Sequence, residues 1–308
     1  MTDEVLLAAR KVTRYYGPRQ ALFAVDIHVA RGEILGFLGA NGAGKSTTMQ
    51  ILTGALAADA GTVEICGVDL AEQPLAGKAR LGYLPEVPPL YGDMLVDDYL
   101  RSCARLRGVA AAACPQAVAR ARARCGLADV GGRLIAHLSK GYQQRVGIAQ
   151  AIVHEPSVLI FDEPTAGLDP IQIRDMRELI RELGRDRGIM VSTHILPEIR
   201  ALASRIVILH HGRVVHDAPV RNDGRVRARF RYDPGAAVLA AMAGVAGVQA
   251  SANGWLLTVS EAEAAAEALA IHAVGAGWGL LELDPHHDDL EALFVQLTSG
   301  GDPAARAA

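Results

Sequence analysis

Short apolar runs alternate with helical patterns along residues 4–215 of the chain. Residues 22–29 alternate between apolar and polar, which is typical of a strand with one buried face. Later runs are almost continuously apolar and predict strands buried on both faces, at residues 34–37, 158–161, 189–192 and 206–209. Helical patterns occupy 45–52, 171–183 and the residues after Pro197. This alternation predicts an α/β core whose parallel sheet is covered on both faces.

Residues 93–153 differ in composition from the segments on either side. They contain few β-branched runs and long stretches of Ala, Leu and Arg, broken at Gly108, Pro115 and Gly126. Glycine and proline at these points end helices rather than strands. We therefore expect a helical insertion within the α/β core.

A second unit is predicted after residue 218. A strand at 225–232, a helix at 236–243 and a hairpin at 248–259 are followed by a helix at 261–273, a strand at 278–283 and a helix at 289–297. Asn253-Gly254 is a strong two-residue turn signal for the hairpin. The order strand, helix, strand, strand, helix, strand predicts a small ferredoxin-like α+β domain. We expect domains at 1–218 and 219–308.

Composition narrows the choice of partners and compartment. The 308 residues are 50% hydrophobic and carry a net charge of −3, so no global charge attracts nucleic acid or an anionic bilayer. No apolar run approaches the ~18 residues of a membrane span, and no export signal is expected at the N-terminus. A cytoplasmic chain keeps isolated thiols reduced, so we expect ordinary core cysteines at Cys66, Cys103, Cys114 and Cys125.

A phosphate loop follows the apolar run at 34–37. Every fixed position of GxxxxGK[ST] is present in Gly39-Ala40-Asn41-Gly42-Ala43-Gly44-Lys45-Ser46, and Thr47 follows. Glycines let backbone N–H groups converge on phosphate oxygens, and the next helix offers its positive end. We expect Lys45 to neutralise the β and γ phosphates and the Ser46 hydroxyl to ligate Mg²⁺. The alternative is a tight structural turn before a helix.

Two adjacent carboxylates, Asp162 and Glu163, come directly after the apolar run at 158–161. Ligands of open α/β sheets gather at the carboxyl ends of strands. Asp162 is therefore expected to hold Mg²⁺, directly or through water. Successive residues leaving a strand point in different directions, so Glu163 can orient or deprotonate an attacking water. Glu163 as a helix cap is the simpler alternative.

The order of four motifs makes residues 4–215 resemble the nucleotide-binding domain of ABC transporters. They are GANGAGKST at 39–47, LSKGYQQR at 138–145, VLIFDEPTAGLDP at 158–170 and VSTH at 191–194. The resemblance implies a phosphate-loop NTPase core with an antiparallel β portion and a helical insertion. It also implies ATP hydrolysis with Mg²⁺ and a role for Tyr16 in stacking on adenine. Tyr15 is adjacent, so either ring can face the nucleotide.

The resemblance also implies that the site is shared between two copies. The signature segment, defined here as residues 138–142, would place Ser139 and Gly141 on the γ-phosphate held by a partner subunit, with Lys140 and Tyr142 beside them. Asp169 would lie in the loop that passes between subunits, and His194 would reach the γ-phosphate. One phosphate loop per chain then favours a homodimer.

Two positions depart from the common pattern and indicate a subgroup. Glu86 stands where many members have Gln, so its role toward Mg²⁺ is open, because a carboxylate cannot donate a hydrogen bond. Tyr142 replaces Gln in the signature segment. With these residues the chain resembles the ATPases of ABC-2 type exporters, including those of gliding-motility and copper-enzyme-maturation systems. Such proteins act on the cytoplasmic face of the membrane with a separately encoded permease.

Two alternatives concern the second unit. A soluble ABC ATPase acting on ribosomes or nucleic acid would use the alternating Arg225, Arg227, Arg229 and Arg231, but a solvated strand face is the favoured interpretation and a nucleic-acid partner is not expected. Residues 219–308 can instead form a regulatory or dimerising module. His286-His287 beside Asp288-Asp289 lack the spacing of a closed metal site.

Overall fold

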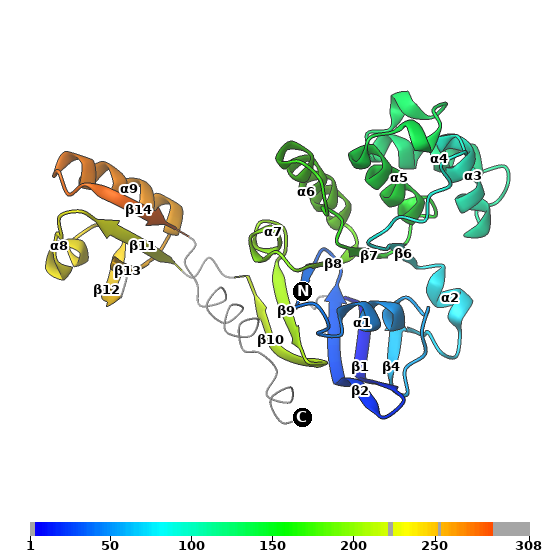
Figure 1. The fold of residues 1–308 in the computed structure, drawn as a ribbon, viewed down its shortest axis with the longest axis horizontal. Helices are drawn as coiled ribbons and strands as arrows, with labels where there is room; N and C mark the ends of the chain where they lie inside the picture. Colours follow the sequence, from blue (N-terminus) through cyan, green and yellow to red (C-terminus); the bar gives the residue numbers. More distant parts are fainter. Residues whose placement is uncertain (1–3, 221–223, 252–253, 286–308) are drawn as a thin grey trace. The chain divides into compact units, whose positions relative to one another are not determined.

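The computed structural model describes residues 4–220, 224–251 and 254–285. The chain divides into two compact units, residues 1–220 and residues 221–308. Each unit has its own hydrophobic core. Figure 1 shows both units, which are described separately below.

An antiparallel sheet of four strands begins the first unit. Its order is β2-β1-β4-β5, with β1 at Val5–Tyr16, β2 at Arg19–Ala30, β4 at Ala60–Ile65 and β5 at Val68–Asp69. The predicted antiparallel portion is confirmed, and β1 runs eight residues beyond the predicted end at residue 8. Strands β4 and β5 were not predicted.

The second sheet holds the predicted parallel strands. Its order is β10-β9-β3-β8-β7-β6, formed by β3 Ile34–Leu38, β6 Leu81–Leu84, β7 Val158–Asp162, β8 Gly188–Thr193, β9 Arg205–His210 and β10 Arg213–Pro219. All pairs are parallel except β9 with β10. Every residue of β3 and β8 is buried, which explains the apolar runs in both strands, although β8 ends in the buried polar residues Ser192 and Thr193.

Helices pack against these sheets. Met49 and Leu52 of α1 (Lys45–Leu52) are fully buried in one core cluster with residues of both sheets. Helix α6 (Pro170–Gly184) and helix α7 (Leu196–Arg200) follow β7 and β8 in the chain. Gly36 of β3 has no room for a side chain, because a Cβ there would lie 2.8 Å from Ile199 of α7. Close packing of α7 on β3 thus depends on this glycine.

The helical insertion is confirmed. It contains α3 (Val96–Leu106), α4 (Cys114–Arg124) and α5 (Lys140–Ile152), which gather in one group in Figure 1. A short helix, α2 (Pro74–Lys78), precedes β6. Of the four free cysteines, Cys114 and Cys125 are buried and the other two are half-buried. Burial raises the pKa of Cys125 to about 12, so this thiol is an inert core residue.

The second unit has the predicted ferredoxin-like topology. Its elements are β11 Arg225–Phe230, α8 Ala236–Ala240, β12 Val245–Ser251, β13 Gly254–Val259, α9 Ala262–Gly275 and β14 Leu280–Asp284. The antiparallel strand order is β12-β13-β11-β14. Gly254 pairs with Ser251 as the first residue of β13, so it is a strand residue and not the turn residue that the sequence predicts, while Asn253 lies outside the described residues. The helix predicted at 289–297 and the residues 286–289 also lie outside them.

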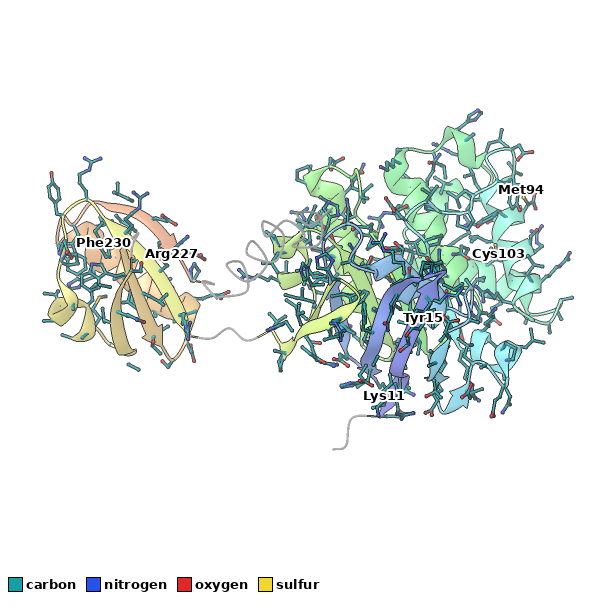
Figure 2. All side chains as sticks on the ribbon, turned by 60° about the horizontal axis from the view of Figure 1, so that its bottom comes forward. Lys11, Tyr15, Met94, Cys103, Arg227 and Phe230 are labelled. Atoms are coloured by element: carbon teal, nitrogen blue, oxygen red, sulfur yellow. The ribbon has the colours of Figure 1, made fainter. Side chains whose placement is uncertain are left out.

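Arginine side chains on β11 meet acidic partners within this sheet. Val226 and Ala228 are buried, whereas Arg227 and Arg229 alternate with them and bind Glu282 of β14 at 2.7 and 3.3 Å. Figure 2 labels Arg227 and Phe230 on this strand. The carboxylate of Glu282 therefore offsets part of the positive charge of these two guanidinium groups within the sheet.

Among residues 4–220, 224–251 and 254–285, no helix is both long enough and apolar enough to cross a bilayer. The same residues contain no group of three or more His, Cys, Asp and Glu side chains arranged to hold a metal ion.

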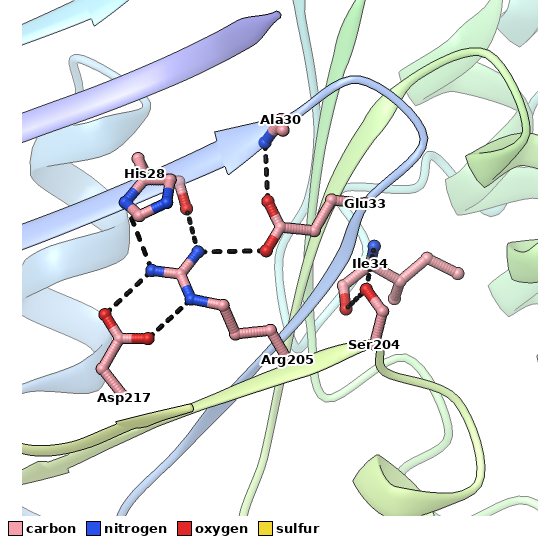
Figure 3. Close-up of polar contacts among 7 residues, drawn as sticks. All are labelled: His28, Ala30, Glu33, Ile34, Ser204, Arg205 and Asp217. Atoms are coloured by element: carbon pink, nitrogen blue, oxygen red, sulfur yellow. Dashed lines mark hydrogen bonds and ion pairs between the residues drawn. The ribbon is translucent and has the colours of Figure 1, made fainter. Parts of the chain in front are cut away.

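A nearly buried arginine ties four segments together at the start of β9 (Figure 3). Arg205 donates to Asp217 of β10 at 2.6 and 2.8 Å, to Glu33 at 3.0 Å and to the backbone oxygen of His28 at 3.1 Å. Glu33 in turn accepts from the backbone N–H of Ala30 at 2.7 Å. Side chains of Arg205 and Glu33 are only 12% and 14% exposed. The cluster therefore joins both sheets through charged groups that are paired and hydrogen-bonded to one another.

Replacing Arg205 with Leu is expected to lower the free energy of unfolding by about 3 kcal/mol, because it leaves Glu33 buried without its cation. Denaturant titration measures the loss. The matched control is Arg10→Leu, whose exposed pair with Glu64 should contribute less than about 1 kcal/mol. Equal losses in the two variants would contradict the assignment.

The same cluster has a pH signature. Hydrogen bonding from Arg205 lowers the pKa of Asp217 below its ordinary value of 3.8. A depressed folded-state pKa stabilises the protein above the ordinary value, and this stabilisation disappears as pH falls through the lowered value. The stability difference between wild type and Arg205→Leu should therefore shrink below about pH 4.

Candidate functional site

The phosphate loop connects β3 with α1, as predicted. Gly44 forms the N-cap of α1 with a φ of 107°, a conformation that side chains rarely adopt, and a Cβ there would lie 2.8 Å from Leu22. Lys45 is buried, and its Nζ donates to the backbone oxygens of Gly39 at 2.6 Å and Ala40 at 3.3 Å. The lysine thus holds the loop curled around its own ammonium group.

The charges of three carboxylates act on this ammonium group. Burial lowers the pKa of Lys45, and the charges of Glu163, Asp162 and Glu86 oppose that effect. Glu86 is exposed in the segment after β6, yet it acts on the charge of both Lys45 and Asp162. The charge of the predicted Glu86 therefore reaches Lys45 of the phosphate loop. The role of Glu86 toward Mg²⁺ stays a prediction.

A cavity of about 710 Å³ opens beside the loop. Ala40, Asn41, Gly42, Gly44, Lys45, Ser46 and Thr47 line it together with Tyr16. The predicted Gly39 and Ala43 are buried and do not line the cavity. Nucleotide pockets have this size, with backbone N–H groups and a few polar side chains.

Tyr16 is the tyrosine that faces the cavity. Its ring lies 5.3 Å from the guanidinium of Arg14 and is 47% exposed, which leaves a face for stacking. Tyr15, labelled in Figure 2, does not line the cavity, and its backbone N–H donates to Asp59 at 2.7 Å. Of the two rings, the geometry favours Tyr16.

One wall of the cavity was not predicted. The turn between β9 and β10 contributes His211 and Gly212, and β10 contributes its first residue, Arg213. Strand β2 contributes Phe23, whose ring centroid lies 4.1 Å from the Arg213 guanidinium. The Gly212 N–H donates to Ala43 at 2.8 Å, and the Phe23 N–H donates to Gly212 at 2.8 Å. The available signal was the carboxyl end of the apolar run at 206–209, which is parallel to β3 and so ends at the same edge of the sheet.

The two adjacent carboxylates diverge at the end of β7, as expected. Ser192 of β8 donates its hydroxyl to Asp162, and burial raises the pKa of Asp162. Glu163 has a φ of 47°, and its backbone N–H donates to the backbone oxygen of Ser192 at 3.1 Å. This left-handed backbone turns the Glu163 side chain away from Asp162 and toward His194.

His194 and Glu163 are in direct contact. The Nδ1 of His194 lies 2.8 Å from Oε1 of Glu163. Glu163 is nearly buried at 12% side-chain exposure, whereas His194 is 56% exposed. The imidazole is therefore fixed on one side by the carboxylate and open on the other.

The signature segment lies at the start of α5. Ser139 is the N-cap, accepting from the N–H of Tyr142 at 3.4 Å, and Tyr142 is 42% exposed. Gly141 packs against α6, because a Cβ there would lie 2.8 Å from Gln172. Lys140 approaches Gly167 in the loop before α6. No residue of the signature segment lines the cavity at the phosphate loop.

Asp169 is the N-cap of α6. Its Oδ1 accepts from the N–H of Gln172 at 2.9 Å. A structural cap is thus one use of this carboxylate within the chain.

Comparisons with known proteins agree with this geometry. Residues 22–166 match the family model described as ABC transporter. The bacitracin transport ATP-binding protein BcrA of Bacillus licheniformis is 36% identical over 216 residues, which is 70% of each chain. The chain belongs to the ABC transporter family. The Nod factor export ATP-binding protein I of Paraburkholderia xenovorans is 35% identical to this ABC ATPase, over 69% of the chain and 70% of that protein.

A solved structure supports the fold of the ABC ATPase. It is described as an ATP binding subunit of an ABC transporter, is 34% identical, has a TM-score of 0.64, and matches 70% of this chain and 90% of that one. The predicted family, phosphate-loop fold and ATPase activity are therefore confirmed. The protein is an ATP-binding, ATP-hydrolysing transporter subunit. Roles of individual site residues stay predictions.

Proposed function

We propose that two copies of this ABC ATPase clamp two ATP molecules and drive a separately encoded membrane permease of the ABC-2 exporter type from its cytoplasmic face. The observation that carries the proposal is the separation of two nucleotide-binding elements within one chain. The phosphate loop lines the cavity, whereas Ser139 and Gly141 lie at the start of α5. The export and transport functions in the names of relatives support the exporter type.

Residues 1–218 form the ATPase domain in this proposal, and residues 219–308 form an accessory domain. The chain divides into two compact units with their boundary between residues 220 and 221, which supports this division. The pairing of Arg227 and Arg229 with Glu282 gives no support to the alternative of a nucleic-acid partner.

Magnesium fits the oxygen donors at the site. Mg²⁺ prefers carboxylate, hydroxyl and phosphate oxygens. Ser46 and Asp162 would hold it, Ser46 from the phosphate loop and Asp162 from the end of β7. Burial raises the pKa of Asp162, and a neighbouring cation would favour its ionised form. Bound Mg²⁺ would neutralise charge on the β and γ phosphates.

The chain's own groups divide the remaining work of hydrolysis. Lys45 holds the phosphates, and Tyr16 stacks on the base. Glu163 accepts a proton from the attacking water, while His194 orients the Glu163 carboxylate through their 2.8 Å contact and reaches the γ-phosphate from its exposed side. In the partner subunit, Ser139 and the positive end of α5 complete the γ-phosphate site.

Mixing two inactive variants tests the shared site. Lys45→Ala disables the phosphate loop and Ser139→Arg disables the signature segment, so each alone should be inactive. In a mixed dimer one site combines the intact halves of both chains. An equimolar mixture should regain about a quarter of wild-type turnover, since half of the randomly formed dimers are mixed and each has one intact site. Steady-state phosphate release measures this recovery.

A matched mixture sets the background. Lys45→Ala mixed with a second variant of the same loop, Ser46→Ala, leaves no site with both halves intact and should stay inactive. Absence of recovery in the first mixture, with both proteins folded and mixed dimers present by mass, would contradict a site shared between chains.

A further inference from the structure

Three side-chain contacts connect β7 and the loop that follows it with β8 and the residues that follow it. Asp162 contacts Ser192, Glu163 contacts His194, and Thr165 donates its hydroxyl to Oε2 of Glu198 at 2.6 Å. The first contact joins neighbouring strands that are paired at those residues. The Glu163–His194 and Thr165–Glu198 contacts lie beyond the last paired residues of β7 and β8, Asp162 and Ser192. Side chains therefore connect the segments at the site of the Glu163–His194 contact.

The Thr165–Glu198 hydrogen bond is built into the fold. Thr165 is 7% exposed, and its backbone oxygen accepts from the N–H of Leu168 at 3.2 Å within the loop that leads to α6. Glu198 is in the first turn of α7, and its neighbour Ile199 is buried against β3. A hydrogen bond to a carboxylate is stronger than one between neutral groups. It joins a buried loop residue to a helix that is itself fixed on the sheet.

We propose that Glu198 is a positioning residue for hydrolysis: through Thr165 it holds the loop after β7 against α7 and thereby keeps Glu163 and His194 in contact. This inference rests on the proposed roles of Glu163 and His194. Because His194 is exposed and lies only two residues before the first residue of α7, its position depends on where α7 lies relative to the β7 loop. The same loop continues to Asp169 and to Gly167, which Lys140 approaches, so the bond also restrains the surface next to the signature segment.

Kinetics of four variants test the proposal. Thr165→Val and Glu198→Ala each remove the hydrogen bond and should lower kcat about tenfold or more, the usual effect of losing a hydrogen bond to a charged group. The KM for ATP should change less than about twofold, because the phosphate loop and Tyr16 are untouched. Thr165→Ser keeps the hydroxyl and Glu198→Gln keeps a carbonyl acceptor, so both should stay near wild type.

The double variant separates a shared interaction from two independent structural effects. Thr165→Val combined with Glu198→Ala should lower kcat no further than either change alone. A kcat loss in the double variant equal to the product of the two single-variant losses would overturn the proposal. An equal loss of kcat in Thr165→Ser and Thr165→Val would also overturn it. Glu178→Ala, at an exposed position of α6, is the control for removal of a carboxylate and should leave kcat unchanged.

Failure of the positioning role of Glu198 can be distinguished from failure of the proposed function. Wild-type turnover in Glu163→Gln would remove the catalytic role of Glu163 and, with it, the basis of this inference. An inactive Glu163→Gln together with wild-type kcat in Glu198→Ala would overturn the positioning role alone. ATP affinity and thermal melting of each variant confirm that the protein is folded.

Discussion

Replacing Glu163 with Gln should lower ATP turnover by about 10² to 10⁴-fold, the range expected for loss of a general base. Gln has nearly the same shape but cannot accept the proton from the attacking water. ATP binding should persist, because Tyr16 and Lys45 hold the nucleotide from other elements of the fold. Steady-state phosphate release and ATP titration measure the two effects separately.

The same variant should accumulate the ATP-bound dimer. If hydrolysis opens the dimer, a chain that binds ATP without hydrolysing it stays closed, and light scattering should report twice the monomer mass with ATP and the monomer mass without it. Glu178→Gln is the matched control, since Glu178 is exposed on α6. Turnover of Glu163→Gln at the wild-type rate would exclude it as the base.

Local sequence patterns predict much of the secondary structure of the ATPase core correctly. Helix α1 has the predicted limits of 45 and 52, because the phosphate loop precedes it and Gly54, with a φ of 67°, follows its last turn. Strand β3 was predicted from its apolar run because both of its faces are buried. The limits of α1 and the position of β3 depend on residues that are close in sequence, so they can be predicted from one sequence.

Choosing between Tyr15 and Tyr16 required the structure. Strand alternation assigns faces only while the register is regular, and β1 has irregularities between Val12 and Arg14 and again between Arg14 and Tyr15. A one-residue shift exchanges the two faces. Near this end of β1, the pattern therefore could not decide which ring lines the cavity.

Contacts between distant segments were also outside the reach of sequence patterns. His211 and Arg213 join the cavity through a turn that follows β9, some 170 residues after the phosphate loop. Glu198 meets Thr165 because β7 and β8 are parallel neighbours that end at the same edge of the sheet. None of these four residues is unusual in its local sequence, so the fold is needed to identify them individually.

Replacing Lys45 with Ala should weaken ATP binding about 100-fold, because hydrogen bonds to charged groups contribute up to about 3 kcal/mol and each 1.4 kcal/mol is tenfold in affinity. The side chain now donates to Gly39 and Ala40 within the loop. Its removal therefore takes away both the phosphate ligand and the group that holds the loop curled. Equilibrium titration with a fluorescent ATP analogue measures the affinity.

Lys11→Asn is the matched control for loss of a lysine charge. Lys11 is exposed on β1, is labelled in Figure 2 and has a φ of 51°, a conformation that Asn adopts more readily than most residues. Its ATP affinity should match wild type. Unchanged affinity in Lys45→Ala would place the phosphates elsewhere and would also remove the premise of the mixing experiment. Lost affinity with recovery in that mixture would instead place the phosphate loop and the signature segment of each active site on different chains.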